Sequence, residues 1–172
     1  IKGSGAELMH KSEAGAVLVN ILNEADVTAA FDDVSRRLGS KFEGVLVQEM
    51  IKGRRELVIG MHREPHFGPC VMLGLGGVMT EIINDTAFRV APFDEIEALD
   101  MVSHLRAKQI FDAFRGEAPA DIEMLGRSLT ALGRIGLDHE AISEIDINPM
   151  IIGPDGKLTA VDALIVLKGD RT

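Results

Sequence analysis

The sequence predicts an α+β fold, in which strands and helices occupy separate stretches of the chain. Two observations carry this prediction. Several stretches repeat apolar residues at the spacing of an amphipathic helix, and short runs rich in Val, Ile and Leu lie between them and end at turn residues. The 172 residues are 46% hydrophobic, enough for a good core, so we expect one domain spanning residues 1–172.

The first half of the chain is expected to be mostly strands around one helix. Residues 3–14 are small and polar and should form a loop, whereas residues 15–21 form the apolar run GAVLVNI, which is typical of a strand. Residues 24–38 follow the helical period, and Gly39 ends that helix. Further strands are expected at 45–50, 56–61, 67–73, 78–83 and 88–90.

Helices and a terminal hairpin are expected in the second half. Asp94 can cap a helix that continues to Leu105, because its carboxylate can accept from unpaired backbone N–H groups. Helical spacing returns over 107–114 and 121–135. The hairpin turns at Gly153-Pro154-Asp155-Gly156-Lys157, where the proline and the glycines suit a tight turn.

The hairpin carries the most informative residues of the chain. Strand side chains alternate between faces, so Glu144, Asp146 and Asn148 should share one face and the two intervening isoleucines the other. A three-residue loop would pair Gly153 with Lys157, and counting back places Asn148 opposite Asp162. Asp162 interrupts an otherwise apolar strand, and a carboxylate there needs a partner.

These four oxygen-bearing side chains predict a site for a hard cation. Mg²⁺ is usually held by one or two protein oxygens together with phosphate oxygens and water. We therefore expect Asn148 and Asp162 to hold Mg²⁺ beside a nucleotide, with Asp146 and Glu144 adjacent.

Composition narrows the classes of function. The net charge of −9 makes a nucleic acid or an anionic membrane an improbable partner. No apolar run approaches the length of a membrane span. Cys70 is the single cysteine, which fits a reducing, cytoplasmic setting. The chain begins with Ile1-Lys2, which resembles the end of a strand, so we expect it to be part of a larger protein.

Four stretches of the chain resemble the nucleotide-binding ATP-grasp domain of the NDP-forming acyl-CoA synthetases, above all the β part of ADP-forming acetate-CoA ligase. The succinyl-CoA synthetase β subunit is a more distant relative. The stretches are Lys2 with His10-Lys11-Ser12 and Gly15; Val47-Gln48-Glu49-Met50; Gly74-Leu75-Gly76-Gly77 with Glu81, Asp85, Arg89 and Pro92; and Glu144 to Pro149 with Asp162. Their order and spacing make the resemblance fairly specific over nearly the whole chain.

The resemblance implies a role for each stretch. His10 would be a phosphohistidine that relays a phosphoryl group, because imidazole is a good nucleophile near neutral pH. Lys2 would contact ATP phosphates, and the segment at 48–50 would hold adenine. Gly76 and Gly77 would let the backbone approach a phosphate closely. Each has a plainer alternative: a surface histidine, a solvated lysine, an ordinary strand end, and a turn or bulge.

Two further residues are left open within this resemblance. Glu56 could face the nucleotide or the solvent. Arg89 could bind phosphate, or it could pair with Glu81 or Asp85. The resemblance implies ATP or ADP and Mg²⁺ as cofactors.

The implied function is the nucleotide-binding part of an ADP-forming acyl-CoA synthetase. The family's domain begins with a small lobe upstream, so the ATP-grasp fold is expected to be incomplete at the N-terminus. The CoA-binding and ligase domains are also absent, so this chain alone should not complete the reaction and needs such a domain or subunit as its partner; an oligomer is compatible with this. The alternative is an ATP-grasp-like domain of a protein lysine acetyltransferase that senses a ligand without turnover.

Overall fold

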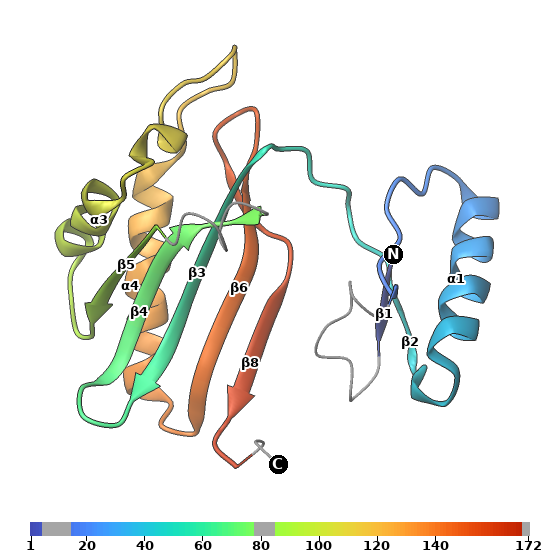
Figure 1. Cartoon of the computed structure of the whole chain (residues 1–172), viewed down its shortest axis with the longest axis horizontal. Coiled ribbons are helices and arrows are strands. Elements are labelled where there is room, and N and C mark those ends of the chain that lie inside the picture. Colours follow the sequence, from blue (N-terminus) through green and yellow to red (C-terminus); the bar gives the residue numbers. More distant parts are fainter. Residues whose placement is uncertain (5–14, 78–84, 170–172) are drawn as a thin grey trace. The chain divides into compact units, whose positions relative to one another are not determined.

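The computed structural model describes residues 1–4, 15–77 and 85–169, and the chain divides into two compact units, Ile1–Met50 and Ile51–Thr172 (Figure 1). Each unit has a hydrophobic core of its own. The first unit, called the N-unit below, carries Lys2 and the segment at 48–50. The second, called the C-unit, carries the large sheet and the terminal hairpin.

The N-unit is a helix packed on a small sheet. Helix α1 (Glu24–Leu38) has the predicted bounds and begins at Asn23, whose side chain accepts from the Asp26 backbone N–H. The short helix η1 (Gly39–Lys41) follows it. Strands β1 (Lys2–Ser4) and β2 (Gly44–Leu46) pair antiparallel, and Val34 and Leu38 of the helix are buried in the core.

Two strands predicted in the N-unit are shorter than expected or absent. Residues 15–21 run beside β1, and the Leu18 backbone N–H donates to the Ile1 carbonyl, but Val17 alone forms a bridge, to Lys2. The reason is that β1 offers three residues to pair with, and Asn20 then turns the chain at a φ of 60°. Likewise β2 ends at Leu46, so residues 47–50 are exposed and outside any strand.

The C-unit is built on a six-stranded sheet in which neighbouring strands are antiparallel. The strand order is β5-β4-β3-β6-β7, and β8 also pairs with β6. The strands are β3 (Arg55–Glu64), β4 (Gly68–Leu75), β5 (Thr86–Val90), β6 (Ile142–Ile152), β7 (Leu158–Ala160) and β8 (Ala163–Leu167). The predicted α+β class and antiparallel hairpins are confirmed.

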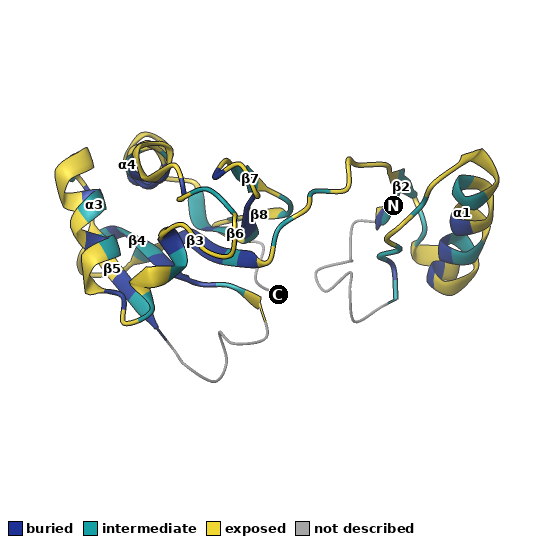
Figure 2. Cartoon of the chain, turned by 90° about the horizontal axis from the view of Figure 1, so that it is seen from above, coloured by how far each residue is buried: buried dark blue, intermediate teal, exposed yellow. Residues whose placement is uncertain are grey.

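Helices cover one face of this sheet (Figure 2). Helix α3 (Glu95–His104) begins at Asp94 as predicted, with a capping box to Glu97, and helix α4 (Ile122–Asp138) begins at Asp121. Leu125 and Leu129 of α4 are fully buried with Leu57 and Ile59 of β3. We call this the core face and the other side the open face. No helix in the described part of the chain is long and apolar enough to cross a membrane.

The helix predicted at 107–114 is instead a single short turn, η3 (Lys108–Phe111). The cause is the buried Arg55 guanidinium, which donates to the backbone carbonyls of Ile110 (3.2 Å) and Asp112 (3.0 Å). It also donates to Ala118 and Gly153. The Arg55 side chain therefore donates to carbonyls that would accept from backbone N–H groups if the helix continued.

The terminal hairpin has the predicted register. The Gly153 N–H donates to the Lys157 carbonyl (2.8 Å), and the Asn148 N–H donates to the Asp162 carbonyl (3.2 Å). On its other edge β6 pairs with β3, and that register shifts by one residue between Leu57 and Ile59. This bulge returns Met150 to the core although it has the same parity as Asn148, which is exposed.

Candidate functional site

Acidic side chains line the open face along β6. Ile145 is buried in the core cluster and Ile147 packs against it, so Glu144, Asp146 and Asn148 alternate with them toward the opposite side. The predicted division of the two faces is confirmed at these positions. Because Asn148 is paired with Asp162 across the hairpin, the fourth predicted oxygen donor is brought to the same end of the row.

The charges in this row disfavour one another. The pKa of Asp146 is raised, first by partial burial and then by the neighbouring carboxylates of Glu144 and Asp162. Each of these causes disfavours a negative charge on Asp146. A cation at this position would relieve the repulsion, so the electrostatics of the row suit a metal-binding role.

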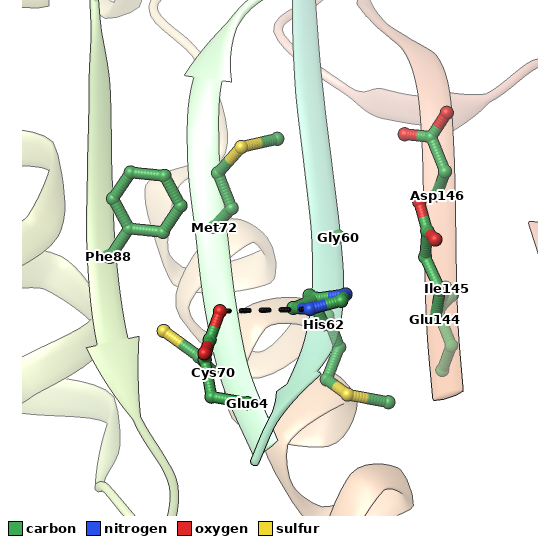
Figure 3. A pocket seen from close by; sticks show the side chains of 10 residues that line it. Gly60, His62, Glu64, Cys70, Met72, Phe88, Glu144, Ile145 and Asp146 are labelled. Atoms are coloured by element: carbon green, nitrogen blue, oxygen red, sulfur yellow. Dashed lines mark ion pairs between the residues drawn. The ribbon is translucent and has the colours of Figure 1, made fainter. Parts of the chain in front are cut away.

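A pocket of about 200 Å³ lies beside the acidic row, on the open face of β3, β4, β5 and β6 (Figure 3). Glu144 and Asp146 line one side of it, and Met72 and Phe88 line the other. Gly60 and His62 of β3 lie between them, and Glu64 and Cys70 complete the lining. The pocket therefore combines acidic, imidazole, sulfur and aromatic groups within one stretch of sheet.

Local backbone structure keeps this pocket open. Gly60 is the register partner of Asp146, and a Cβ atom at position 60 would come within 2.6 Å of the Ile145 carbonyl oxygen. Only glycine fits there without a shift of the backbone. The floor of the pocket beside Asp146 is consequently bare main chain.

A glycine corner lies at the end of β4. The Gly76 N–H donates to the Glu56 carbonyl (2.7 Å), and a Cβ at position 76 would lie 2.8 Å from the Glu56 carbonyl carbon. Gly77 has a φ of 73°, and a Cβ there would lie 3.1 Å from a Glu56 carboxylate oxygen. The structure thus brings together three residues that the sequence predicted to bind the cofactor. Gly74 and Leu75, which follow the strand expected at 67–73, belong to β4.

The oxygen donors of the row match the preferences of a hard cation. Two carboxylates and one amide, from Asp146, Asp162 and Asn148, are the oxygen ligands that Mg²⁺ accepts, and they leave positions for phosphate and water. Within the described ranges, no group of three or more His, Cys, Asp or Glu side chains is arranged to enclose an ion. The residues therefore fit a shared site, completed by ligand oxygens, better than a cage made by the protein alone.

Arg89 and Asp85, which also belong to the C-unit, lie apart from this row. Arg89 is on the core side of β5 and its guanidinium donates to Asp100 of α3 at 2.7 Å, rather than to Asp85. Asp85 is buried and accepts from the backbone N–H groups of Arg106 and Ala107, both at 2.9 Å. Lys2 lies on β1 of the N-unit.

Three further predictions concern residues 48–50, His10 and the strand expected at 78–83. Gln48, Glu49 and Met50 are exposed residues at the end of the N-unit. His10 and the strand expected at 78–83 lie outside the described residues. Their roles stay predictions.

Sequence reasoning missed the other half of the pocket. His62 and Cys70 were given no role, yet they are register partners on β3 and β4 and both line the pocket. His62 pairs with Glu64 at 3.7 Å, and burial raises the pKa of the Cys70 thiol, with a further contribution from Glu64. The available signal was period-two alternation: Cys70 and Met72 alternate with the buried Val71 and Leu73, and His62 follows the buried Met61.

A family profile described as the ATP-grasp domain matches residues 1–167, nearly the whole chain. The chain belongs to the ATP-grasp family. Within the family it resembles the β subunit of acetate–CoA ligase (ADP-forming) I from Pyrococcus furiosus, with 39% identity over 94% of this chain and 71% of the relative. The resemblance inferred from motifs is confirmed.

Other ATP-grasp relatives are longer. The chain is 38% identical to 4-hydroxybutyrate–CoA ligase (ADP-forming) from Nitrosopumilus maritimus over 91% of its own length but 23% of that enzyme's. It therefore spans about a quarter of that ligase.

The ATP-grasp fold is also supported by a solved structure. The dinucleotide forming acetyl-coenzyme A synthetase 1 of Ca. Korarchaeum cryptofilum, in complex with coenzyme A and Ca-AMPCP, matches with a TM-score of 0.91 and 41% identity. The match covers 97% of this chain and 75% of that one. The same enzyme in complex with Mg-AMPPCP, with a phosphohistidine segment pointing towards the nucleotide binding site, matches with a TM-score of 0.85.

Proposed function

We propose that the intact protein is an ADP-forming acyl-CoA synthetase and that this chain is its nucleotide-binding part. The overall reaction would convert acyl-CoA, ADP and phosphate into the free acid, ATP and CoA. This chain would transfer a phosphoryl group between the nucleotide and a histidine. The partner would be a CoA-binding and ligase domain or subunit, which is supported by the naming of one relative as a β subunit and the greater length of another.

The observation that carries this proposal is the acidic row on the open face. Asp146 and Asn148 of β6 and Asp162 of the same hairpin present oxygen donors, and partial burial together with the neighbouring carboxylates raises the pKa of Asp146. Mg²⁺ bound there would neutralise phosphate charge during transfer. Asn148 and Asp162 would hold the cation, with Asp146 and Glu144 beside it.

The remaining residues would position the nucleotide. Gly76 and Gly77 leave the backbone accessible next to Glu56, which suits a close approach by phosphate. Lys2 would contact phosphate as a point charge, and the segment at 48–50 would offer backbone groups to adenine. Arg89 is engaged by Asp100 on the core side, so we place it outside the nucleotide site.

His10 would carry the phosphoryl group as the relay. Its imidazole nitrogen would attack the phosphorus, the bond to the donor oxygen would break, and the reverse step would return the group to ADP. A ligand-sensing role without turnover remains the competing interpretation, but the relatives found are named as ligases, which supports the enzyme. A cytoplasmic location is expected from the single cysteine.

The metal assignment can be tested by replacing Asp162 in the full-length protein. We expect Asp162→Ala to weaken Mg²⁺-dependent ADP binding by about tenfold or more, since the protein would lose one of the two oxygen ligands that hold the cation beside the nucleotide. Asp155→Ala is a matched control, because Asp155 lies in the turn of the same hairpin, where its carboxylate bonds to Lys157. Calorimetry with and without Mg²⁺ measures the effect, and equal affinities for the two variants would refute the assignment.

The relay can be tested separately. His10→Ala should abolish acyl-CoA-dependent ATP formation by the full-length protein while ADP binding and the melting temperature are retained. His66→Ala, at an exposed histidine in the β3–β4 turn, is the control and should remain active. Near-normal turnover by His10→Ala would show that His10 does not relay the phosphoryl group and would favour the ligand-sensing role.

A further inference from the structure

A second pocket, of about 580 Å³, lies in the C-unit away from the acidic row. It is lined by Arg54 and Arg55, where β3 begins, and by residues of the segment 107–117 that include Phe114, Arg115 and Glu117. None of the residues that line it also lines the pocket beside Asp146. Its volume is within the range of small-molecule sites, which is about 300–1,000 Å³.

Charge in this pocket is opposite to that of the protein as a whole. The chain has a net charge of −9, yet three arginines and one glutamate line the pocket. Glu117 is already paired with the buried Arg55, at 3.2 Å from its Nε. Arg54 and Arg115 are exposed, and neither has an ion pair with a carboxylate in the part of the chain that the structure describes. The pocket therefore presents two guanidinium groups that could receive an anion.

The walls are held rigidly by Arg55. It is 5% exposed and donates four hydrogen bonds to backbone carbonyls, of which two belong to the segment that leads to Phe114 and one to the segment that follows Glu117. A site whose walls are fixed before binding loses less entropy when the ligand arrives. Phe114, 55% exposed, adds an apolar ring surface to the opening.

The turn that presents Arg115 is unusual in its sequence. Phe114 and Glu117 exchange backbone hydrogen bonds of 3.3 and 2.9 Å around Arg115 and Gly116, whose φ angles are 49° and 86°. A two-residue turn with both φ angles positive strongly favours Asn-Gly or Asp-Gly. Arginine in this position is strained, and strain of this kind tends to be retained at functional sites. Its guanidinium lies 5.0 Å from the centre of the Phe114 ring.

From these observations we propose that the pocket binds a small organic oxyanion that carries a flat ring. The ring would lie against Phe114, and the forks of Arg54 and Arg115 would take the oxyanion, because guanidinium groups match carboxylate and phosphate geometry in two-point contacts. The ligand would occupy this site independently of Mg²⁺ and of the acidic row. The oxyanion could be a phosphate or a carboxylate, and these two sources are separable.

The test uses the full-length protein and two probes, AMP and benzoate, titrated without divalent cation by calorimetry. Arg115→Asn is the decisive variant, since asparagine suits the positive φ better and the turn should persist. We expect Arg115→Asn to weaken binding by about tenfold or more while the melting temperature is unchanged or higher. Arg54→Gln should weaken it similarly, and it decides the matter if Arg115→Asn is less stable.

Arg134→Asn is the matched control, because Arg134 is an exposed arginine on α4 outside the pocket, and it should bind as the wild type does. Binding of AMP alone identifies a phosphate ligand, and binding of benzoate alone identifies a carboxylate. The proposal is overturned if neither probe binds at about 10 mM, or if Arg115→Asn and Arg54→Gln bind as tightly as the control.

Discussion

In β3, alternate residues serve opposite purposes: Leu57, Ile59 and Met61 pack under α4, whereas Gly60 and His62 lie on the open face beside the acidic row. The core face is apolar and closely packed. The open face collects carboxylates, and partial burial together with the charges of Glu144 and Asp162 raises the pKa of Asp146. Neighbouring residues of one strand therefore serve different ends: those on the core face stabilise the fold, and those on the open face line the candidate site. Substitutions on the core face should mainly lower stability, and substitutions on the open face should mainly change binding.

The largest expected effect is a loss of stability on the core face. Met61 is 1% exposed in the core cluster, so Met61→Ala should lower the free energy of unfolding by about 2–5 kcal/mol, because it leaves a cavity. Met72→Ala removes the same side chain from the open face and should cost less than about 1 kcal/mol. Denaturant unfolding of both variants measures the difference, and equal losses would contradict the comparison.

The next effect tests how closely the core face is packed. Gly136 of α4 faces Pro69, and a Cβ there would lie 2.7 Å from the Pro69 Cβ and 3.2 Å from the Met61 sulfur. Gly136→Ala should therefore destabilise by about 1–3 kcal/mol although alanine favours helix.

Gly126 in the same helix is the matched control for Gly136. A Cβ at position 126 would meet Leu99 at an ordinary 3.4 Å, so Gly126→Ala should be neutral or stabilise by up to about 1 kcal/mol. Opposite signs for the two substitutions are the expected outcome in thermal unfolding. A stabilising Gly136→Ala would show that α4 lies less tightly on the sheet.

A smaller effect on nucleotide affinity is expected at Arg89, which lies on the core side of β5. Its ion pair with Asp100 lies on the core side, and the Arg89 guanidinium lowers the pKa of Asp100 by a hydrogen bond. We expect Arg89→Met to change Mg²⁺-dependent nucleotide affinity by less than about twofold, with a slight loss of stability. Calorimetry gives the affinity. A loss comparable to that of Asp162→Ala would return Arg89 to the nucleotide site.

The smallest effect has the opposite sign. Because the folded-state pKa of Asp146 is raised above its unfolded value, ionisation destabilises the fold above the folded-state pKa. This penalty disappears as the pH falls below the unfolded-state pKa. Asp146→Asn should therefore stabilise the cation-free protein at pH 7 by a few tenths of a kcal/mol, since Asp146 is partly exposed and its charge is screened.

Unfolding of Asp146→Asn and wild type at pH 7 and at about pH 3 checks the sign, because the advantage of the variant should vanish in acid. Added Mg²⁺ with nucleotide should also reduce the advantage, since the cation offsets the same repulsion. A variant that is less stable at pH 7 would mean that the carboxylate of Asp146 has a favourable partner.

Features that depend on residues close together in the chain were predicted correctly from the sequence. Helix α1 has its predicted bounds, Asp94 caps α3, and the hairpin register follows from its turn, so that Asn148 lies opposite Asp162. Each of these depends on residues that are close in the chain or on period-two alternation. Such signals survive in the sequence because the interactions that produce them span a few positions.

The tertiary structure decided what depends on distant residues. Arg55 takes the carbonyls of Ile110 and Asp112, more than fifty positions away, and so replaces a predicted helix with a short turn. Arg89 pairs with Asp100 because β5 lies beside α3. His62 and Cys70 became pocket residues only when β3 and β4 paired in register. These outcomes require packing between elements. Side-chain partners across a sheet or under a helix depend on which elements lie side by side in the folded protein, and their separation along the chain does not predict them.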